Sequence, residues 1–297
     1  MAALTQANFS HVVQKDLSEI FAVRYGEFQS MIPALYEIEE PDQAVVYQQL
    51  LGDLGSVPVF ASDISYDDTK QSYRKSIEEI EYAMGVKVTK KLRRNDIYGA
   101  VRTTIAILAD RFRAKRESIG ADFFNGAFST TTVGDGKVLC YSAHTSDVGG
   151  SNQSNAGSTV FSPAAVEATR RLMIKYKTNR DNITLDFPDM LIVPTELEEA
   201  AYELIKTKGK VDTANNNDNF HKGKYKLVVW HNWLSDSNNW FMVKSNQMKD
   251  YLKFYEWNPV EFFYAGDMDT LTSKHAGYMS VNVGSADWRW IYGHNVS

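Results

Sequence analysis

Apolar residues recur at helical spacing in two long stretches of the chain. Between residues 4 and 30 they return every three or four positions, which predicts an amphipathic helix. The same spacing extends over about residues 96–124, and Asn95 or Asp96 can cap that second helix at its start. At about 1.5 Å per residue the second helix would be roughly 40 Å long, a length that suits the backbone of an extended domain.

Alternation of apolar and polar residues predicts a strand at residues 81–89 (EYAMGVKVT). The segment from residue 246 to the end indicates further strands and no helix. These late strands need partners, and the 81–89 strand is the candidate. Other strands are expected at MLIVP (190–194), KLVVWH (226–231) and NWFMVK (239–244), the last two joined by a turn.

The middle of the chain has the pattern of a separate unit. A proline after Ser162 opens a helix that extends to about residue 177, because proline is well tolerated in a first helical turn. The sequence TELE (195–198) has the spacing of a capping box, which predicts a helix to about residue 205. Residues 160–245 therefore indicate an α/β or α+β unit, inserted between the 81–89 strand and the late strands.

Two stretches show little apolar periodicity. Residues 46–80 carry glycine, proline and aspartate between short apolar runs, so we expect a long excursion with little core of its own. Long excursions in compact proteins are usually functional. Residues 124–159 are rich in Gly, Ser, Thr and Asn, with one short strand expected at 138–141. This change of composition marks a domain boundary.

Composition narrows the class of protein. The chain has 297 residues, of which 43% are hydrophobic and 23% charged, so it has enough apolar material for one large or two smaller cores. The net charge of −5 argues against DNA as an obvious direct ligand. The single cysteine, Cys140, excludes an intrachain disulfide and a thiolate zinc cluster. The N-terminus does not resemble a secretory signal, and no apolar run is long enough to span a membrane.

The sequence GSADWRWIYG (284–293) gathers aromatic side chains close to the end of the chain. In a strand, Trp288, Trp290 and Tyr292 would lie on one face. Such a face could stack on bases or sugars, but aromatic side chains dominate cores, so we expect these three rings to be buried.

Other polar groups are weak candidates for chemistry. The run Lys90-Lys91-Leu92-Arg93-Arg94 could hold phosphates or an acidic partner, and more often is a solvated junction. Asp267 and Asp269, with Glu261 nearby, could bind a hard cation, although this spacing is common.

Cys140 and His144 have the residue types of a nucleophile and its base, but such pairs normally come from distant parts of a sequence. The six histidines show no metal-ligand spacing, and the familiar nucleotide-binding and hydrolase motifs are absent. We therefore expect no catalytic, cofactor-binding or metal-binding residues.

The order of these features resembles one family. The most specific pieces are EYAMGVKVTKKLRRNDIYG leading into the long helix, MLIVPTELEEAAYELI, and the final SADWRWIYG. Together they resemble the major capsid (head) protein of tailed bacteriophages, with the Hong-Kong-97-type shell fold and closest to the head subunit of Mu-like phages. The resemblance covers nearly the whole chain and implies an α+β fold.

The resemblance also implies a division of the chain. It consists of an N-terminal arm (1–45), an extended loop (46–80), a peripheral domain with a long spine helix (81–128), an inserted α/β axial domain (129–245) and return strands of the peripheral domain (246–297). The polar loop 211–224 is the candidate for a loop that points at a five- or sixfold axis. The aromatic rings near the C-terminus would then close a thin sheet against the spine helix.

The implied function is structural rather than enzymatic. The chain would assemble as pentamers and hexamers into an icosahedral head in the host cytoplasm, enclosing double-stranded DNA through weak, non-specific contacts. Implied partners are further copies of the chain, a separate scaffolding protein, a portal, and a maturation protease or decoration protein, with no cofactor and no membrane. Some members of the family carry a scaffolding segment fused before the arm. For this chain we expect a separate scaffolding protein, or a segment that a maturation protease has removed.

Two alternatives stay open at this point. One is an encapsulin-like nanocompartment shell, which shares the fold and encloses an enzyme. The other is a hydrolase or carbohydrate-binding protein that uses the tryptophan-rich end and the Asp267/Asp269 pair.

Overall fold

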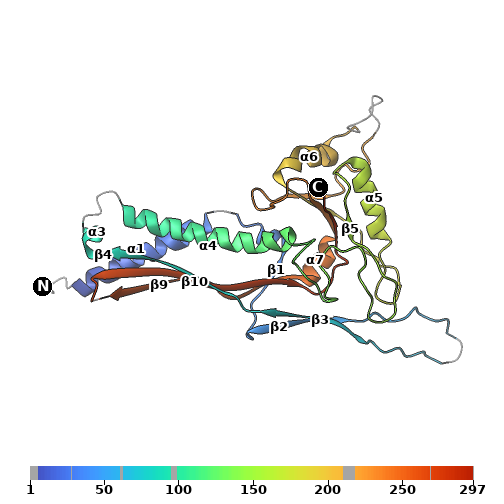
Figure 1. Ribbon diagram of the computed structural model, residues 1–297, viewed down its shortest axis with the longest axis horizontal. Coiled ribbons are helices and arrows are strands. Elements are labelled where there is room, and N and C mark those ends of the chain that lie inside the picture. Colours follow the sequence, from blue (N-terminus) through green and yellow to red (C-terminus); the bar gives the residue numbers. More distant parts are fainter. Residues whose placement is uncertain are drawn as a thin grey trace.

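The computed structural model describes residues 6–27, 29–60, 63–94, 99–209, 218–267 and 269–296. The molecule has an elongated part, an upright part at one end of it, and a two-stranded hairpin that runs beneath the upright part and projects past it (Figure 1). This mixed helix and sheet architecture confirms the predicted α+β class.

A four-stranded sheet forms the floor of the elongated part, in the order β1-β9-β10-β4. Its strands are β1 (Glu37–Glu39), β4 (Glu81–Thr89), β9 (Leu252–Asp267) and β10 (Thr272–Ser285). β4 pairs antiparallel with β10, and β10 pairs antiparallel with β9. The strand predicted at 81–89 and its pairing with the late strands are therefore confirmed.

Two long helices cover one face of this sheet: α1 (Gln6–Gly26) and α4 (Ala100–Asn125) (Figure 1). Both were predicted from their apolar spacing. The ring of Phe112 on α4 lies so close to Gly277 of β10 that a Cβ there would overlap it, which is why this strand carries glycine at the crossing. Arg116 of α4 forms an ion pair with Glu256 of β9 at 3.2 Å, and both side chains are largely buried.

The start of α4 differs from the prediction. Its N-cap is Gly99 in the left-handed conformation (φ 67°), with no side-chain hydrogen bond to the helix. The predicted caps, Asn95 and Asp96, lie outside the described residues.

A five-stranded sheet forms the centre of the upright part, in the order β5-β11-β8-β6-β7. Helices α5, with Ser162 as its N-cap, and α6 pack beside it (Figure 1). All four residues of β6 and of β8 are buried, as the apolar runs predicted. The elements are β5 (Ala156–Gly157), α5 (Pro163–Ile174), β6 (Met190–Val193), η1 (Thr195–Leu197), α6 (Glu198–Lys206), β7 (Lys226–Val229), β8 (Trp240–Val243), α7 (Ser245–Tyr251) and β11 (Ile291–His294).

The C-terminal end of α4 extends into the core of the upright part. The ring of Phe124 packs edge-on against Trp230, Phe241 and Trp290, with centroid distances of 6.1, 5.7 and 6.3 Å. On its other side it packs edge-on against Tyr36, which lies next to β1. One continuous core therefore joins the two parts.

The aromatic residues near the C-terminus are buried, as predicted, but they do not share a strand. Trp288 and Trp290 lie in the turn before β11, and only Tyr292 is in the strand. The relative exposures of the three side chains are 3%, 0% and 6%. A hydrolase or carbohydrate site based on these rings is therefore wrong, because no face of them is open to a ligand.

The prediction that all late strands return to the peripheral sheet is wrong for the last one. β11 pairs antiparallel with β8 and parallel with β5, so it belongs to the sheet of the upright part. A strand pattern reports which face is buried and carries no information on which distant strand is the partner.

Several local predictions also need correction. TELE (195–198) is not a capping box, because a 3-10 turn occupies 195–197 and α6 begins at Glu198 with no side-chain cap. The segment after residue 246 does contain helix, namely most of α7, which buries only Met248 and so shows no apolar period. The connection predicted between β7 and β8 joins two strands that do not pair with each other, because β6 lies between them in the sheet. The strand expected at 138–141 is reduced to a single bridge between Thr132 and Val138.

Residues 46–80 are more regular than expected. They contain most of the hairpin, formed by β2 (Val45–Leu51) and β3 (Gln71–Glu78). Two short helices complete the described elements: α2 (Ile32–Leu35), which includes Pro33, and α3 (Lys90–Arg94). Among the described residues, no helix combines the length and the apolar character needed to cross a membrane.

Trp290 is fully buried, and its indole N–H donates to the Asp287 carbonyl at 2.8 Å. Trp290→Ala should lower the free energy of unfolding by about 3–5 kcal/mol, because it leaves a large cavity in the shared core. Urea unfolding followed by circular dichroism measures this. Tyr202→Ala, at a half-exposed position on α6, is the control and should change stability by less than about 0.5 kcal/mol. Equal stabilities of the two variants would contradict the prediction.

A second prediction concerns His294 of β11, which stacks on Trp240 at 4.1 Å. Burial lowers the pKa of His294 from 6.5 to about 4. Between these two values the unfolded chain binds a proton that the folded chain does not, so the free energy of unfolding falls as the pH falls. The contribution lost by pH 4 is about 3 kcal/mol.

The test compares the free energy of unfolding at pH 7 and pH 4.5 for the native chain and for His294→Gln. The substitution should flatten this pH dependence, whereas His231→Gln, at an exposed histidine, should leave it unchanged. An unchanged slope in His294→Gln would exclude His294 as the source.

Candidate assembly surface

The hairpin β2–β3 has little core of its own. Its strands pair antiparallel, with Val46 opposite Ile77, and most of their side chains are exposed or half-buried. We call the connection between the strands the loop tip, defined as residues 52–60 and 63–70. It projects beyond the upright part (Figure 1).

The root of the hairpin is fixed on the four-stranded sheet. Ile77 is buried against Gly284 of β10, where any Cβ would overlap the isoleucine side chain. On β2, the Gln48 amide donates to the Tyr255 hydroxyl at 2.9 Å and to the Tyr251 carbonyl at 3.2 Å. Apolar packing and hydrogen bonding therefore both define where the hairpin leaves the sheet.

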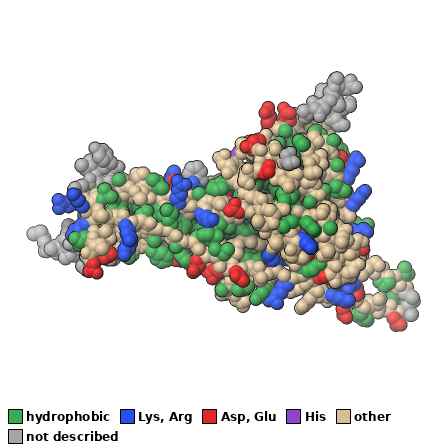
Figure 2. All heavy atoms as spheres, viewed as in Figure 1, with side chains coloured by type: hydrophobic (Ala, Val, Ile, Leu, Met, Phe, Trp, Pro, Cys, Tyr) green, Lys and Arg blue, Asp and Glu red, His purple; other side chains and the backbone are tan. Residues whose placement is uncertain are grey.

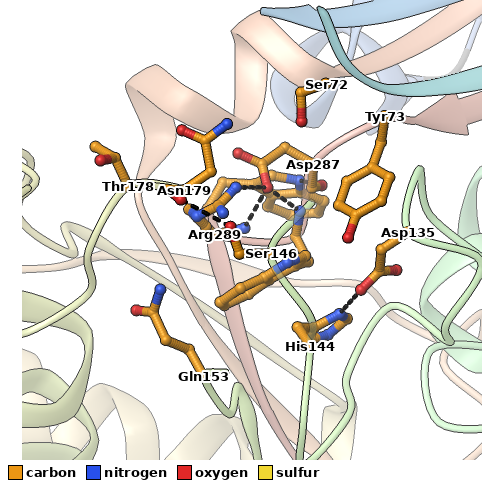
Figure 3. Close-up of polar contacts among 12 residues, drawn as sticks. Ser72, Tyr73, Asp135, His144, Ser146, Gln153, Thr178, Asn179, Asp287 and Arg289 are labelled. Atoms are coloured by element: carbon orange, nitrogen blue, oxygen red, sulfur yellow. Dashed lines mark hydrogen bonds and ion pairs between the residues drawn. The ribbon is translucent and has the colours of Figure 1, made fainter. Parts of the chain in front are cut away.

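Polar side chains of β3 form hydrogen bonds to the Gly- and Ser-rich stretch (124–159) of the upright part. Figure 3 shows Ser72 and Tyr73 of β3 above this stretch. Three hydrogen bonds join them: Ser72 Oγ to Asp147 Oδ1 (2.9 Å), Tyr73 Oη to the Thr145 carbonyl (3.1 Å) and Lys75 Nζ to Thr132 Oγ1 (2.6 Å). Each one reaches a residue more than fifty positions away in the sequence. On this side the hairpin is therefore held by side chains rather than by a sheet ladder.

A buried polar cluster stiffens that stretch. His144 Nδ1 lies 2.7 Å from Asp135 Oδ2 (Figure 3), and its Nε2 lies 3.0 Å from Asn155 Oδ1. The imidazole ring stacks on Trp288 at 4.3 Å. Burial acts to raise the pKa of Asp135, but hydrogen bonds from His144 and from the Lys137 N–H outweigh it, so that pKa lies below its ordinary value.

Asp287 explains why Trp288 lies in a turn. Its Oδ1 accepts from the Trp288 N–H at 2.7 Å and from the Arg289 guanidinium at 2.9 Å (Figure 3). Arg289 Nε also donates to the Lys177 carbonyl at 3.1 Å. Aspartate commonly forms such bonds to the N–H groups that follow it, which favours a turn over a strand.

Residues 178–182 of the upright part hold the base of the loop tip. The Asn182 amide donates to Asp53 Oδ2 at 2.8 Å, and Arg180 forms an ion pair with Asp67. The Gly55 N–H and the Arg180 guanidinium together lower the pKa of Asp67. Among its described residues, the loop tip is therefore hydrogen-bonded to the upright part only at its base, at residues 53–54 and 67–68.

Beyond that base the loop tip exposes apolar side chains. Val57, Val59 and Tyr66 have relative exposures of 96%, 94% and 88%, and Phe60 and Ile64 are also largely exposed. Figure 2 shows hydrophobic side chains on this projecting segment. Exposed apolar groups gathered in this way are typical of a surface that another protein covers.

The Cys140/His144 pair does not have the geometry of a nucleophile and base. Cys140 is buried next to Gly293, and burial raises the pKa of its thiol. His144 uses both ring nitrogens on Asp135 and Asn155.

The remaining sequence candidates lie far from the hairpin. Asp267 ends β9 and accepts a charged hydrogen bond from Lys274 at 3.3 Å, with Asp269 in the turn that follows. Glu261 lies within β9, opposite Tyr278. The basic run forms α3 (Lys90–Arg94), at the end of β4. Among the residues that the structure describes, no group of three His, Cys, Asp or Glu side chains is placed to hold a metal ion.

Comparison with known families identifies the chain. A family model described as phage capsid protein matches residues 74–293, which is more than half of the sequence. The chain belongs to this phage capsid protein family. It is thus a structural protein of the virion shell, as the resemblance implied. The closer likeness to Mu-like phages stays a prediction.

Solved structures show the same fold at low sequence identity. The capsid protein of bacteriophage JBD30 aligns with a TM-score of 0.59 and 12% identity, over 70% of this chain and 92% of that one. A virus-like particle protein from Pyrococcus furiosus gives 0.56 and 9%, over 95% and 98% of the two chains. A Mycobacterium phage Adephagia chain gives 0.53 and 12%, over 91% of each. The fold is therefore of the Hong-Kong-97 type. No curated protein sequence matches the chain.

The sequence did not point to the residues that tie down the loop tip. Asn179, Arg180 and Asn182 lie in a polar run that resembles an ordinary loop. The available signal was the run TNRDN (178–182), in which all five side chains can bind backbone or carboxylate groups, next to the alternating pattern ITLDF (183–187).

Arg180→Ala should loosen the loop tip without destabilising the rest of the protein. Loss of the ion pair with Asp67 raises the population in which the tip is detached, so cleavage by chymotrypsin at Phe60 or Tyr66 should accelerate about threefold or more. Limited proteolysis with mass spectrometry measures this. Arg171→Ala, which removes an exposed ion pair with Glu167 on α5, is the matched control and should leave cleavage unchanged. Equal cleavage rates in the two variants would exclude the role of Arg180.

Proposed function

We propose that this chain assembles with copies of itself as pentamers and hexamers into an icosahedral head that encloses double-stranded DNA. The observation that carries the proposal is the loop tip, which is fixed at its base and exposes Val57, Val59 and Tyr66 at its end. A chain that acted alone would gain nothing from holding apolar side chains away from its core. A copy of the chain is the partner that a shell supplies at every position.

The division of the chain supports this role. We assign residues 1–45 to an N-terminal arm, 46–80 to the extended loop, 81–128 to the peripheral domain and 129–245 to the axial domain. Residues 246–297 return to the peripheral domain, except that β11 lies in the sheet of the axial domain.

The loop 211–224 is our candidate for the segment at a five- or sixfold axis. Residues 211–217 lie outside the described residues. The remaining residues of this loop, 218–224, lie close to α6, because the Asn219 amide donates to the carbonyls of Leu204 and Thr207.

The net charge of −5 suits a wall that encloses DNA without binding it tightly, because tight binding requires many cationic contacts to phosphate. We propose a separate scaffolding protein, a portal, and a maturation protease or decoration protein as further partners in the host cytoplasm. A JBD30 procapsid chain and a JBD30 capsid decorated with minor capsid protein trimers share the fold.

An encapsulin-like nanocompartment is the second candidate. It is favoured by the likeness to the Pyrococcus furiosus virus-like particle, which extends over nearly all of both chains. The two functions share the fold and differ in what the shell encloses.

Negative-stain electron microscopy with light scattering on the purified chain tests the proposal. Rings, tubes or closed shells are the expected result. Shells purified from the natural source should contain DNA, whereas an enclosed enzyme would favour the nanocompartment. A chain that stays monomeric at all concentrations, also with the other head proteins present, would exclude both.

The double substitution Val57→Asp with Val59→Asp should prevent assembly while the subunit stays folded. Each subunit contact would lose about 3 kcal/mol of apolar burial, which lowers its equilibrium constant by about a hundredfold. Light scattering measures assembly, and circular dichroism measures folding. The matched control, Val57→Ile with Val59→Ile, keeps the apolar surface and should assemble. Normal shells from the aspartate variant would show that the loop tip is not the contact.

A further inference from the structure

Residues 183–187 (ITLDF) lie in the connection between α5 and β6, and their apolar and polar side chains alternate with the apolar ones outward. Ile183, Leu185 and Phe187 point outward, with relative exposures of 74%, 86% and 66%. The two residues between them, Thr184 and Asp186, are half-buried. The apolar side chains therefore face solvent while the polar ones face the protein.

Hydrogen bonds of the inner residues fix this arrangement. Thr184 donates from its N–H and its hydroxyl to the Tyr176 carbonyl, at 3.2 and 2.9 Å. Thr184 Oγ1 also accepts from Lys244 Nζ at 3.3 Å, and Asp186 Oδ2 accepts from the Gln247 amide at 2.7 Å.

Lys244 determines which side chains of residues 183–187 face the protein. Its side chain is only 1% exposed, and burial lowers its pKa to about 8. A shift of the segment by one residue would turn the apolar side chains inward, but it would take the hydroxyl of Thr184 away from this buried amine. The hydrogen bond between Lys244 and Thr184 therefore keeps the side chains of Ile183, Leu185 and Phe187 exposed.

Among the described residues the segment belongs to no sheet, and only Ile183 pairs, in an isolated bridge with Lys177. It presents isoleucine, leucine and phenylalanine to solvent, where an exposed segment usually carries polar side chains. Within the described parts of the chain, the N–H groups of Leu185, Asp186 and Phe187 make no hydrogen bond. A further chain can cover both the side chains and the backbone.

The segment continues the surface of the loop tip. Asn182, the residue immediately before it, donates to Asp53 and to the Leu54 carbonyl at the base of the tip. The apolar side chains of 183–187 therefore begin where the loop tip is anchored, so one neighbour can cover both.

We infer that residues 183–187 bind a second copy of this chain, in the same subunit contact as the loop tip. The inference rests on the proposed function, and it adds a contact on the axial side that the extended loop alone does not supply. A copy of the chain is the occupant that fits, because whatever covers the loop tip of every subunit lies next to this segment in every subunit.

The experiment uses thiol labelling with a maleimide. The native chain has one cysteine, which is buried and whose thiol pKa is raised, so it gives a low background. Leu185→Cys places a thiol at an exposed position where folding does not depend on the side chain. Its labelling should be fast in unassembled subunits and slower by about tenfold or more in shells formed by the chain alone.

Val57→Cys in the loop tip is the companion variant, and it distinguishes the contact at 183–187 from the contact at the loop tip. Protection at position 57 with full labelling at position 185 would overturn the inference and leave the proposed function intact. Full labelling at both positions in closed shells would overturn the loop-tip contact as well. Failure of the native chain to assemble, also with the other head proteins present, would overturn both.

One further outcome identifies a different occupant. If the thiol of Leu185→Cys reacts freely in shells of the chain alone but is protected in complete heads, another head protein covers the segment. That result would also overturn the inference that a second copy does so.

Discussion

Packing of Phe124 where the core passes from the elongated part into the upright part is the interaction on which the shape of the molecule depends. Its ring is 1% exposed and lies at the last turn of α4, between Tyr36 on the elongated side and Trp230, Phe241 and Trp290 on the upright side. Each edge-on pair adds about 1 kcal/mol beyond the area it buries. Because the end of α4 packs against residues of both parts, the helix and the five-stranded sheet are held at a fixed angle. A shell subunit needs that angle, since it determines how copies meet.

The hairpin is held in a different way, and the difference has a physical consequence. Beyond Ile77 at its root, β3 is joined to the upright part by hydrogen bonds such as Tyr73 to Thr145 and Lys75 to Thr132. A typical hydrogen bond contributes a net stability of about 1 kcal/mol, and an exposed ion pair contributes less. These bonds define where the loop tip lies without burying its apolar side chains. The free energy of that burial is left for contact with another chain.

Local periodicity explains which parts of the fold could be predicted from the sequence. The helix α4 and the strands β6 and β8 each bury several side chains, so their pattern was clear. The strand at 81–89 buries only Val88, and it was recognised from the alternation of apolar and polar residues in its sequence. β11 was recognised as a strand but assigned to the wrong sheet, because pairing with β8 joins residues far apart in the chain. The helix α7 buries one residue, and β2 and β3 bury one each, so none of them shows a strong period.

The surface proposed for assembly was harder to predict, because its position depends on contacts between distant residues rather than on local periodicity. Absence of a local core correctly marked 46–80 as an excursion, whereas the anchors Arg180 and Asn182 depend on contacts across more than a hundred residues. At 183–187 the pattern by itself is ambiguous, because either side of the alternation could face the domain. The buried amine of Lys244 decides it, since that amine needs the Thr184 hydroxyl and cannot accept Leu185 in its place. Segments that violate the rule for an isolated chain are thus the ones shaped by neighbours, and here two of them share one edge of the subunit.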